Sequence, residues 1–194
     1  MAKRGPYEKG EAKRAEILRV ALEVFAAEGY RGTSLRKVAS ACELSLPGLM
    51  HYFGSKEELL TQVLRARDEE ARGRIGDGGL TDHLQVIRDS AETPGLVELF
   101  VSMAASAGDP RHPASALFSE RYEEYRASLA ERLSRAMDEG ALTRDVPPDR
   151  LAVMLIALVD GIQMQWLNDR AVDMERPVTD LLALLAPDRR ERGG

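Results

Sequence analysis

The chain has 194 residues, a formal net charge of −5 and a single cysteine, Cys42. One cysteine excludes a fold held by internal disulfides and is typical of a reducing compartment. The N-terminal residues lack the apolar run of a signal peptide, and no uninterrupted stretch of about 18 apolar residues predicts a membrane span. We therefore expect a cytoplasmic protein with no membrane partner and with enough residues to bury a sizeable core.

Charge is distributed unevenly along the chain. Residues 1–40 contain nine Lys or Arg and five Glu, a net charge of +4, so the remainder carries −9. The overall acidity argues against nucleic acid, but a basic end joined to an acidic body is typical of a modular DNA-binding protein. Chance asymmetry is the alternative.

The first ten residues predict a flexible basic arm. Residues 1–10 combine two glycines and a proline with three cations and show no helical pattern. Such an arm either reaches a DNA minor groove or stays a solvated tail. A helix is then predicted over residues 11–28, and Gly29 is typical of the position just after a helix C-terminus.

The next segment predicts two short helices joined by a tight turn. Thr33 and Ser34 are candidate N-caps of the first helix, whose apolar positions 35, 38, 39 and 42 share one face. Residues 43–44 leave room only for a turn. Ser45 is a candidate second N-cap, and Pro47 is tolerated in a first helical turn. A helix-turn-helix can place its second helix in the DNA major groove, although a plain helical corner has the same pattern.

The outward side of that second helix is short and includes a glycine. Gly48 is a poor helix former, but glycine is useful where the backbone must come close to a phosphate or a base edge. The residues expected on the DNA-facing side are Ser45, Leu46, Pro47, Gly48, Met50, His51 and Tyr52.

A capping box predicts the start of the following helix. Ser55 and Glu58 have the S-x-x-E spacing of such a box. Lys56 then occupies the first helical position, where a cation opposes the helix dipole. A DNA phosphate held by Lys56 and the nearby N–H groups would remove this conflict.

The rest of the chain predicts helices separated by loops rich in Gly and Pro. No useful strand alternation occurs, so the expected class is all-α with about nine helices. Residues 151–159 form the most apolar run, which continues through Trp166. A helix that is apolar around most of its circumference must be covered on several sides, and a partner subunit is the natural cover.

Several short motifs occur between residues 17 and 60. They are Gly32-Thr33-Ser34, Val38-Ala39, Leu44-Ser45, Gly48-Leu49, His51-Tyr52-Phe53 and Lys56-Glu57. Together with the preceding helix and Gly29-Tyr30, they resemble the DNA-binding domain of the TetR (tetracycline-repressor) family of bacterial regulators. The chain departs from that family at Glu43, where a glycine is usual, at Leu46-Pro47, which replaces a more polar pair, and at Met50, which replaces an aromatic residue.

The resemblance implies a homodimeric transcriptional regulator. It is expected to be a repressor that an unknown small-molecule effector releases from a palindromic double-stranded DNA operator. A constitutive DNA-binding regulator without a ligand is the alternative. The implied domains are a flexible basic arm (1–10), a helix-turn-helix DNA-binding domain (11–54) and a C-terminal helical regulatory and dimerisation domain (55–194).

The resemblance also implies specific contacts. Thr33, Tyr52 and Lys56 are expected to touch phosphates, with Ser34 and Arg36 nearby, while residues 45–51 face bases. The last two long helices of each subunit are expected to pair into a four-helix dimer interface. The residues expected at this interface are Leu155, Leu158, Ile162, Leu181, Leu182 and Leu185.

Large, adaptable side chains between residues 80 and 167 are candidates for an effector pocket. Methionine and aromatic side chains often line apolar ligand cavities, although ordinary core packing is the alternative for each of them. These candidates are Phe100, Met103, Phe118, Tyr122, Tyr125, Met154 and Trp166.

No motif indicates catalysis, a metal or a cofactor. The three histidines are not spaced with Cys42 or with acidic residues as metal ligands, and no nucleophile elbow, P-loop or dinucleotide fingerprint occurs. Cys42 lies on an apolar helical face, which favours a buried structural thiol. Asp160 is either a functional carboxylate or a partner in a structural hydrogen bond. An all-α enzyme is the remaining alternative.

Overall fold

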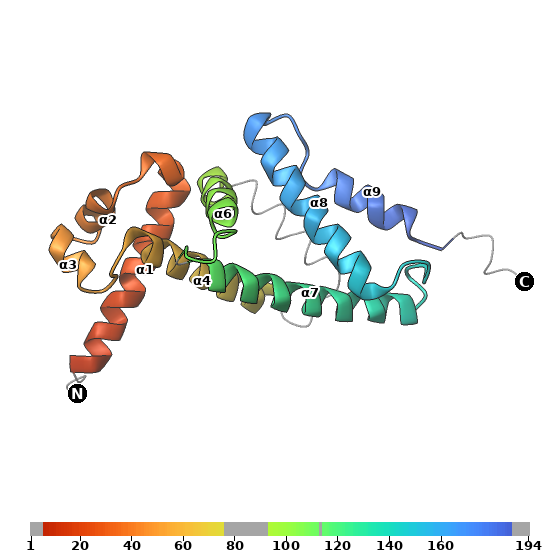
Figure 1. Cartoon of the computed structure of the whole chain (residues 1–194), viewed down its shortest axis with the longest axis horizontal. Helices are drawn as coiled ribbons and strands as arrows, with labels where there is room; N and C mark the ends of the chain where they lie inside the picture. Colours follow the sequence, from red (N-terminus) through yellow and green to blue (C-terminus); the bar gives the residue numbers. More distant parts are fainter. Residues whose placement is uncertain (1–5, 76–92, 113, 188–194) are drawn as a thin grey trace, which may run out of the picture. The chain divides into compact units, whose positions relative to one another are not determined.

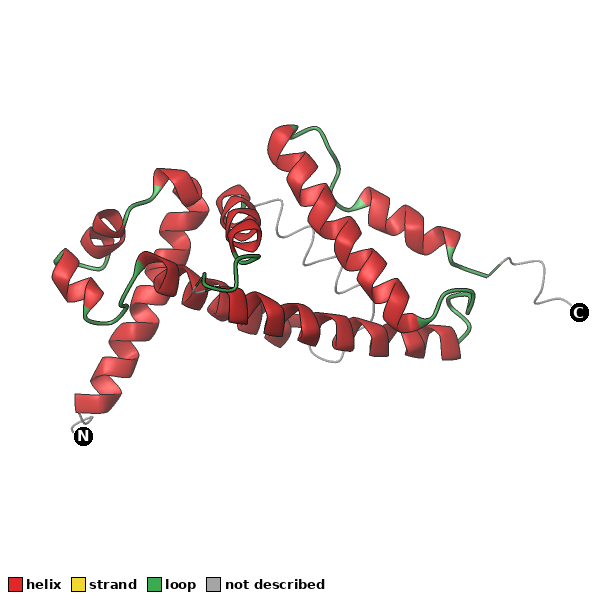
Figure 2. Ribbon diagram, viewed as in Figure 1, coloured by secondary structure: helices red, strands yellow, loops and turns green. Residues whose placement is uncertain are grey.

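The computed structural model describes residues 6–75, 93–112 and 114–187, which form eight α-helices (Figure 1). No strand occurs in these residues, so the all-α expectation is confirmed (Figure 2). Residues 80–91, for which the sequence also predicts a helix, lie outside them. The chain divides into two compact units: the first has the described residues up to 74 and 93–117, and the second has Ile75 and the described residues from 118 onward. This division differs from the expected boundary at residue 54 because α6 packs on α1.

The first helix, α1 (Pro6–Gly32), begins earlier than the sequence predicts. Residues 6–10 are helical, so the prediction of a flexible arm is wrong for these residues. Residues 1–5 lie outside the described residues. Proline is tolerated in a first helical turn, and one glycine, Gly10, costs only about 1 kcal/mol in a helix. The good helix formers that follow outweigh that cost.

Gly29 interrupts α1 four residues before Thr33. Its φ of 72° and ψ of 176° are not helical, and only residues 30–32 of α1 follow this kink. A positive φ is strained for any residue with a Cβ, which explains the glycine. The predicted helix end at Gly29 is therefore confirmed as a break.

The two short helices expected after α1 are present as α2 (Leu35–Ala41) and α3 (Leu46–Met50). Ser34, rather than Thr33, is the N-cap of α2, because its Oγ accepts a hydrogen bond from the Lys37 N–H at 3.3 Å. The helices of this region share one core. Its side chains, each exposed by 1 % or less, are Ile17, Phe25, Val38, Leu49 and Phe53.

The helix α4 (Lys56–Ile75) begins with the predicted cap. Ser55 Oγ accepts a hydrogen bond from the Glu58 N–H at 3.0 Å. The Glu58 carboxylate accepts one at 2.8 Å from the N–H of Gly54, one residue before the position that a standard capping box uses. The first bond satisfies an N–H group that the start of the helix would otherwise leave unpaired, and the second satisfies an N–H group just before the helix.

The helix α6 (Pro94–Ser106) approaches α1 at backbone distance. Gly95 is buried, and a Cβ placed on it would lie 2.1 Å from the carbonyl oxygen of Phe25 and 2.6 Å from that of Ala26. Only a residue without a side chain permits this approach. Gly95 therefore sets the separation between α6 and α1.

The second unit consists mainly of α7 (Ser115–Asp138), α8 (Pro148–Asn168) and α9 (Arg176–Leu184). The first three residues of α7 belong to the other unit. Gly140, with a φ of 70°, follows α7, and the Thr143 N–H donates to the Leu185 carbonyl at 2.7 Å. The core of this unit contains Leu129, Leu133, Leu151, Leu155, Ile162 and Val178.

The exposed side of α8 differs from the predicted interface. Leu155 and Ile162 are each only 4 % exposed, so they belong to the core of the protomer. By length and composition α8 could cross a membrane, but burial of its other face is typical of a core helix in a globular unit. Its outward face carries Val153, Met154, Ala157 and Met164, with Gly161 in open space between them.

We predict that Gly95→Ala lowers the free energy of unfolding by about 1–3 kcal/mol or more, because the new methyl group meets backbone that cannot move aside. Gly10→Ala is the matched control, since its Cβ would meet nothing within 4 Å. It should raise stability by up to about 1 kcal/mol. Urea denaturation measures both, and two variants of equal stability would contradict this account of the α1–α6 contact.

Candidate nucleic-acid interface

The helix α3 is held by its inner face and leaves its outer face to solvent. Leu49 and Phe53 are buried in the core, and the Ser45 Oγ accepts the Gly48 N–H at 3.1 Å. A Cβ on Gly48 would lie 3.2 Å from that Oγ, so glycine keeps the cap unobstructed. The outward residues are Pro47 and His51, which are exposed, and Leu46 and Met50, which are half-buried.

The turn between α2 and α3 contains one strained residue. Glu43 has a φ of 56°, in the left-handed region. Glycine is usual at this position in the family that the segment resembles. A left-handed residue with a Cβ costs about 1–2 kcal/mol. Lys13 Nζ of α1 donates to the carbonyl of the adjacent Cys42 at 3.3 Å. The turn is thus held in a strained conformation by its surroundings.

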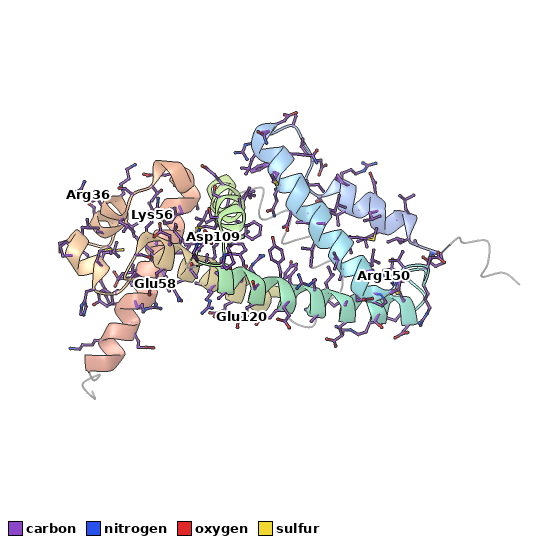
Figure 3. The ribbon with its side chains drawn as sticks, viewed as in Figure 1. Arg36, Lys56, Glu58, Asp109, Glu120 and Arg150 are labelled. Carbon is purple, nitrogen blue, oxygen red and sulfur yellow. The ribbon has the colours of Figure 1, made fainter. Side chains whose placement is uncertain are left out.

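The two neighbouring cations of α2 have different surroundings. Lys37 Nζ lies 2.6 Å from a Glu28 carboxylate oxygen and donates to the Gly32 carbonyl at 3.4 Å. Arg36 of α2 is exposed (Figure 3). It is not a member of any ion pair among the described residues. Lys37 therefore links α2 to the end of α1, whereas the guanidinium of Arg36 can meet an external anion.

Thr33 and Lys56, which are 23 residues apart, meet where α2 and α4 begin. The Lys56 ammonium donates to the Thr33 carbonyl at 3.5 Å. The Thr33 side chain is only 4 % exposed, and its hydroxyl oxygen has no hydrogen-bond partner in the described part of the chain. Thr33 is thus the member of the predicted phosphate-binding set whose side chain is hidden in this structure, while Lys56 carries a cation at a helix N-terminus.

Aromatic and cationic side chains complete the surroundings of α3. The rings of His51 and Tyr52 meet edge to face, with centroids 5.6 Å apart. The Arg14 guanidinium of α1 lies 4.8 Å from the centre of the Phe53 ring, a cation–π contact that connects α1 to the residues after α3. The sequence does not reveal the roles of Lys13, Arg14 and Lys37, because these contacts are made with other elements and no local pattern records them.

Cys42 is a structural thiol. It is 2 % exposed, and burial raises its pKa, while the nearby Lys13 charge lowers the pKa by less. A raised pKa keeps the thiol protonated at neutral pH, and a protonated thiol is a weak nucleophile. Within the described residues, no group of three or more His, Cys, Asp or Glu side chains could hold a metal ion.

In the second unit, Asp160 is hydrogen-bonded within the chain. The Tyr122 hydroxyl of α7 donates to an Asp160 carboxylate oxygen of α8 at 2.7 Å. Burial raises the pKa of Asp160, and burial together with this hydrogen bond raises the pKa of Tyr122. One turn further along α8, the buried side-chain oxygen of Gln163 has no hydrogen-bond partner in the described residues. The pair Tyr122–Asp160 therefore links α7 to α8 through a polar contact in a largely apolar unit.

The pocket candidates divide between the two units. Phe100 and Met103 are buried in the first unit, and the other five lie in the second. There, Phe118 and Trp166 are buried, Tyr122 and Tyr125 are half-buried, and Met154 is 50 % exposed on the outward face of α8. The Arg170 guanidinium lies 3.7 Å from the centre of the Trp166 ring.

Comparison with known proteins identifies the family. Residues 17–63 match the sequence profile of bacterial regulatory proteins of the tetR family. Residues 83–187 match the C-terminal profile of BetI-type transcriptional repressors, and this second match alone covers more than half of the chain. The chain therefore belongs to the TetR family and is a DNA-binding transcriptional regulator.

Relatives and solved structures agree with this assignment. The HTH-type transcriptional repressor AcnR of Corynebacterium glutamicum is 29 % identical over 182 residues, which cover 90 % of this chain and 93 % of AcnR. A TetR-family regulator from Rhodococcus sp. matches 91 % of this chain and all of its own, with a TM-score of 0.69 and 22 % identity. Thermus thermophilus FadR, a TetR-family repressor solved with lauroyl-CoA, matches 89 % of this chain and 92 % of its own, with a TM-score of 0.57 and 24 % identity.

Because Glu43 has a positive φ, we predict that glycine is more stable than alanine at this position, the reverse of their order in a helix. In an ordinary helix Gly is about 1 kcal/mol less stable than Ala, but at a positive φ this order reverses. Glu43→Gly should therefore be about 1 kcal/mol more stable than Glu43→Ala, which removes the same side chain. Thermal and urea denaturation of the two variants measure the difference. An alanine variant as stable as the glycine variant would contradict a strained turn.

Proposed function

We propose that the chain binds a palindromic operator as a homodimer and that a small-molecule effector releases it. The observation that carries the DNA contact is the outward face of α3, whose side chains are exposed or half-buried. Arg36 of α2 and Lys56 at the start of α4 add two cations to it. The proposed phosphate contacts come from the side chains of Lys56, Arg36 and Tyr52. Thr33 is proposed to contribute its backbone N–H, because its hydroxyl is buried. The name of AcnR as a repressor supports repression, and we propose the cytoplasm as its location.

Two substitutions test the DNA contact. Lys56→Ala should weaken binding to all sequences about equally and reduce the slope of log affinity against log salt by about one, because one phosphate contact is lost. Gly48→Glu should abolish binding, because it places bulk and negative charge on α3. Fluorescence anisotropy with duplexes selected from a random pool measures both.

The control for Lys56→Ala is Arg126→Ala, which removes an exposed cation from α7. It should leave the affinity and the salt slope unchanged. Melting curves separate lost contacts from lost folding, since Lys56 also bonds to the Thr33 carbonyl. Normal operator binding by a folded Gly48→Glu variant would contradict the assignment of α3 as the recognition helix.

The homodimer is proposed to form through the outward face of α8 together with α9. This face carries Val153, Ala157 and Met164, and the small residues Ala157 and Gly161 would let a partner helix approach closely. On α9, Leu184 is 81 % exposed, while Leu181 and Leu182 are half-buried. The C-cap residue Leu185 and Leu158 of α8 are half-buried as well. A two-fold dimer binds a two-fold site, which accounts for the proposed palindrome.

Ala157→Asp should give a folded monomer with reduced operator affinity, because the charge enters the proposed contact between subunits but is exposed in the protomer. Ala127→Asp, at an exposed position of α7, is the matched control and should stay dimeric. Leu155→Asp, by contrast, should unfold the unit because Leu155 is buried. Analytical ultracentrifugation gives the oligomeric state, and a dimeric Ala157→Asp variant would count against this interface.

The effector is proposed to act on the helices of the second unit, from which α4 transmits the change to Lys56. An effector must bind the form without DNA better, typically by about 1–3 kcal/mol, and DNA must weaken effector binding by the same factor. Trp166 is the only tryptophan of the chain, so its fluorescence reports effector binding without a label.

A compound that changes Trp166 emission saturably should lower operator affinity by the same factor by which operator DNA lowers the affinity for the compound. Lauroyl-CoA is the first probe, because the similar structure of FadR contains it. Saturable binding of a compound with unchanged operator affinity would favour the alternative, a constitutive regulator without this switch. Titrations in both orders distinguish the two.

A further inference from the structure

The outward face of α3 has an unusual composition for a surface that meets DNA. Residues 44–53 contain no Lys, Arg, Asp, Glu, Asn or Gln. The side chains on this outward face are Leu46, Pro47, Met50 and His51. Leu49 and Phe53 are buried and attach α3 to the core, whereas Leu46 and Met50 are half-buried and Pro47 is exposed.

This composition limits how α3 can distinguish bases. Guanine is usually bound in the major groove by Arg or Lys, adenine by Asn or Gln, and cytosine by Glu or Asp. None of these side chains lies between residues 44 and 53. Apolar side chains can instead contact the C5-methyl group of thymine, which only an A·T pair presents in this groove. His51 and the Ser45 hydroxyl are the polar groups that remain on the face.

The spacing of the apolar residues suits contact with neighbouring bases. Leu46 and Met50 are four residues apart, and Pro47 and Met50 are three apart, so all three lie on one side of the helix. Leu46 and Met50 are half-buried, and the ring of Pro47 is rigid, so little side-chain freedom is lost on binding. Residues 46–50 rise by about 6 Å, which corresponds to about two base-pair steps.

We propose that α3 identifies its operator half-site through the methyl groups of two or three neighbouring thymines, contacted by Leu46, Pro47 and Met50. This inference rests on the proposed DNA contact of α3 and adds to it the chemical group that is bound. Arg36 and Lys56 then supply affinity from outside the helix, and the apolar face supplies the discrimination between bases.

The test uses the full-length chain and duplexes that it selects from a random pool. Each thymine of a selected half-site is replaced singly by deoxyuridine, which lacks only the methyl group, and the dissociation constant is measured. Replacement at two or three neighbouring positions should weaken binding about fourfold each, the effect expected for one buried methyl group. Thymines elsewhere in the duplex are internal controls and should show no loss.

Protein variants then identify the contacting side chains. In Leu46→Ala and Met50→Ala, the uracil effect should disappear at the thymine that each residue contacts, since a double-mutant cycle isolates that pair. Arg36→Ala is the matched control. It should lower affinity for thymine and uracil duplexes by the same factor and leave their ratio unchanged. Leu46 and Met50 are not core residues, and melting curves verify that the variants fold.

The outcomes separate the inference from the function on which it rests. Selected half-sites without thymine, or uracil effects below twofold at every position, would overturn thymine recognition while DNA binding by α3 stands. Uracil effects that persist fully in both alanine variants would assign the methyl contacts to other residues and likewise overturn the proposal. A chain that enriches no duplex would instead overturn the proposed DNA-binding function, and the inference with it.

Discussion

The contact on which the DNA-binding unit depends is the backbone approach between α6 and α1. At Gly95 the two helices come so close that a single methyl group would overlap the Phe25 carbonyl. This approach fixes α1, and α1 in turn holds the other elements of the unit. Lys13 reaches the turn after α2, Arg14 covers the ring of Phe53, and Glu28 pairs with Lys37 of α2. The position of α3 is therefore set from outside the helix-turn-helix itself.

This arrangement separates the charges that hold the unit together from those available to a ligand. The cations Lys13, Arg14 and Lys37 are engaged with carboxylates, carbonyls or an aromatic ring, so they contribute to the placement of α2 and α3. Arg36 is exposed, and Lys56 stands at the start of α4. In the proposed complex these cations would supply affinity and the apolar α3 would supply sequence discrimination, because phosphate contacts are the same for every sequence.

In the second unit, α8 has apolar residues on both its buried and its exposed face. One face of α8 packs into the protomer through Leu151, Leu155 and Ile162, and the opposite face remains apolar and exposed. Between them, Asp160 accepts the hydrogen bond from Tyr122, which accounts for a carboxylate in an otherwise apolar run. Burial raises the pKa of this carboxyl group, so the contact links α7 to α8 at the cost of desolvating a carboxylate.

The local structure could be predicted from the sequence, because caps, breaks and apolar periodicity depend on neighbouring residues. Ser34, Ser45, Ser55 and the break at Gly29 are all visible in this way. The early start of α1 was missed because proline and glycine are also typical of loops. Which leucines of α8 face the core was decided only by tertiary packing, since a helix that is apolar on all sides carries no periodic signal. The burial of Thr33 and the contact at Gly95 likewise arise between elements distant in sequence, where local patterns contain no information about distance.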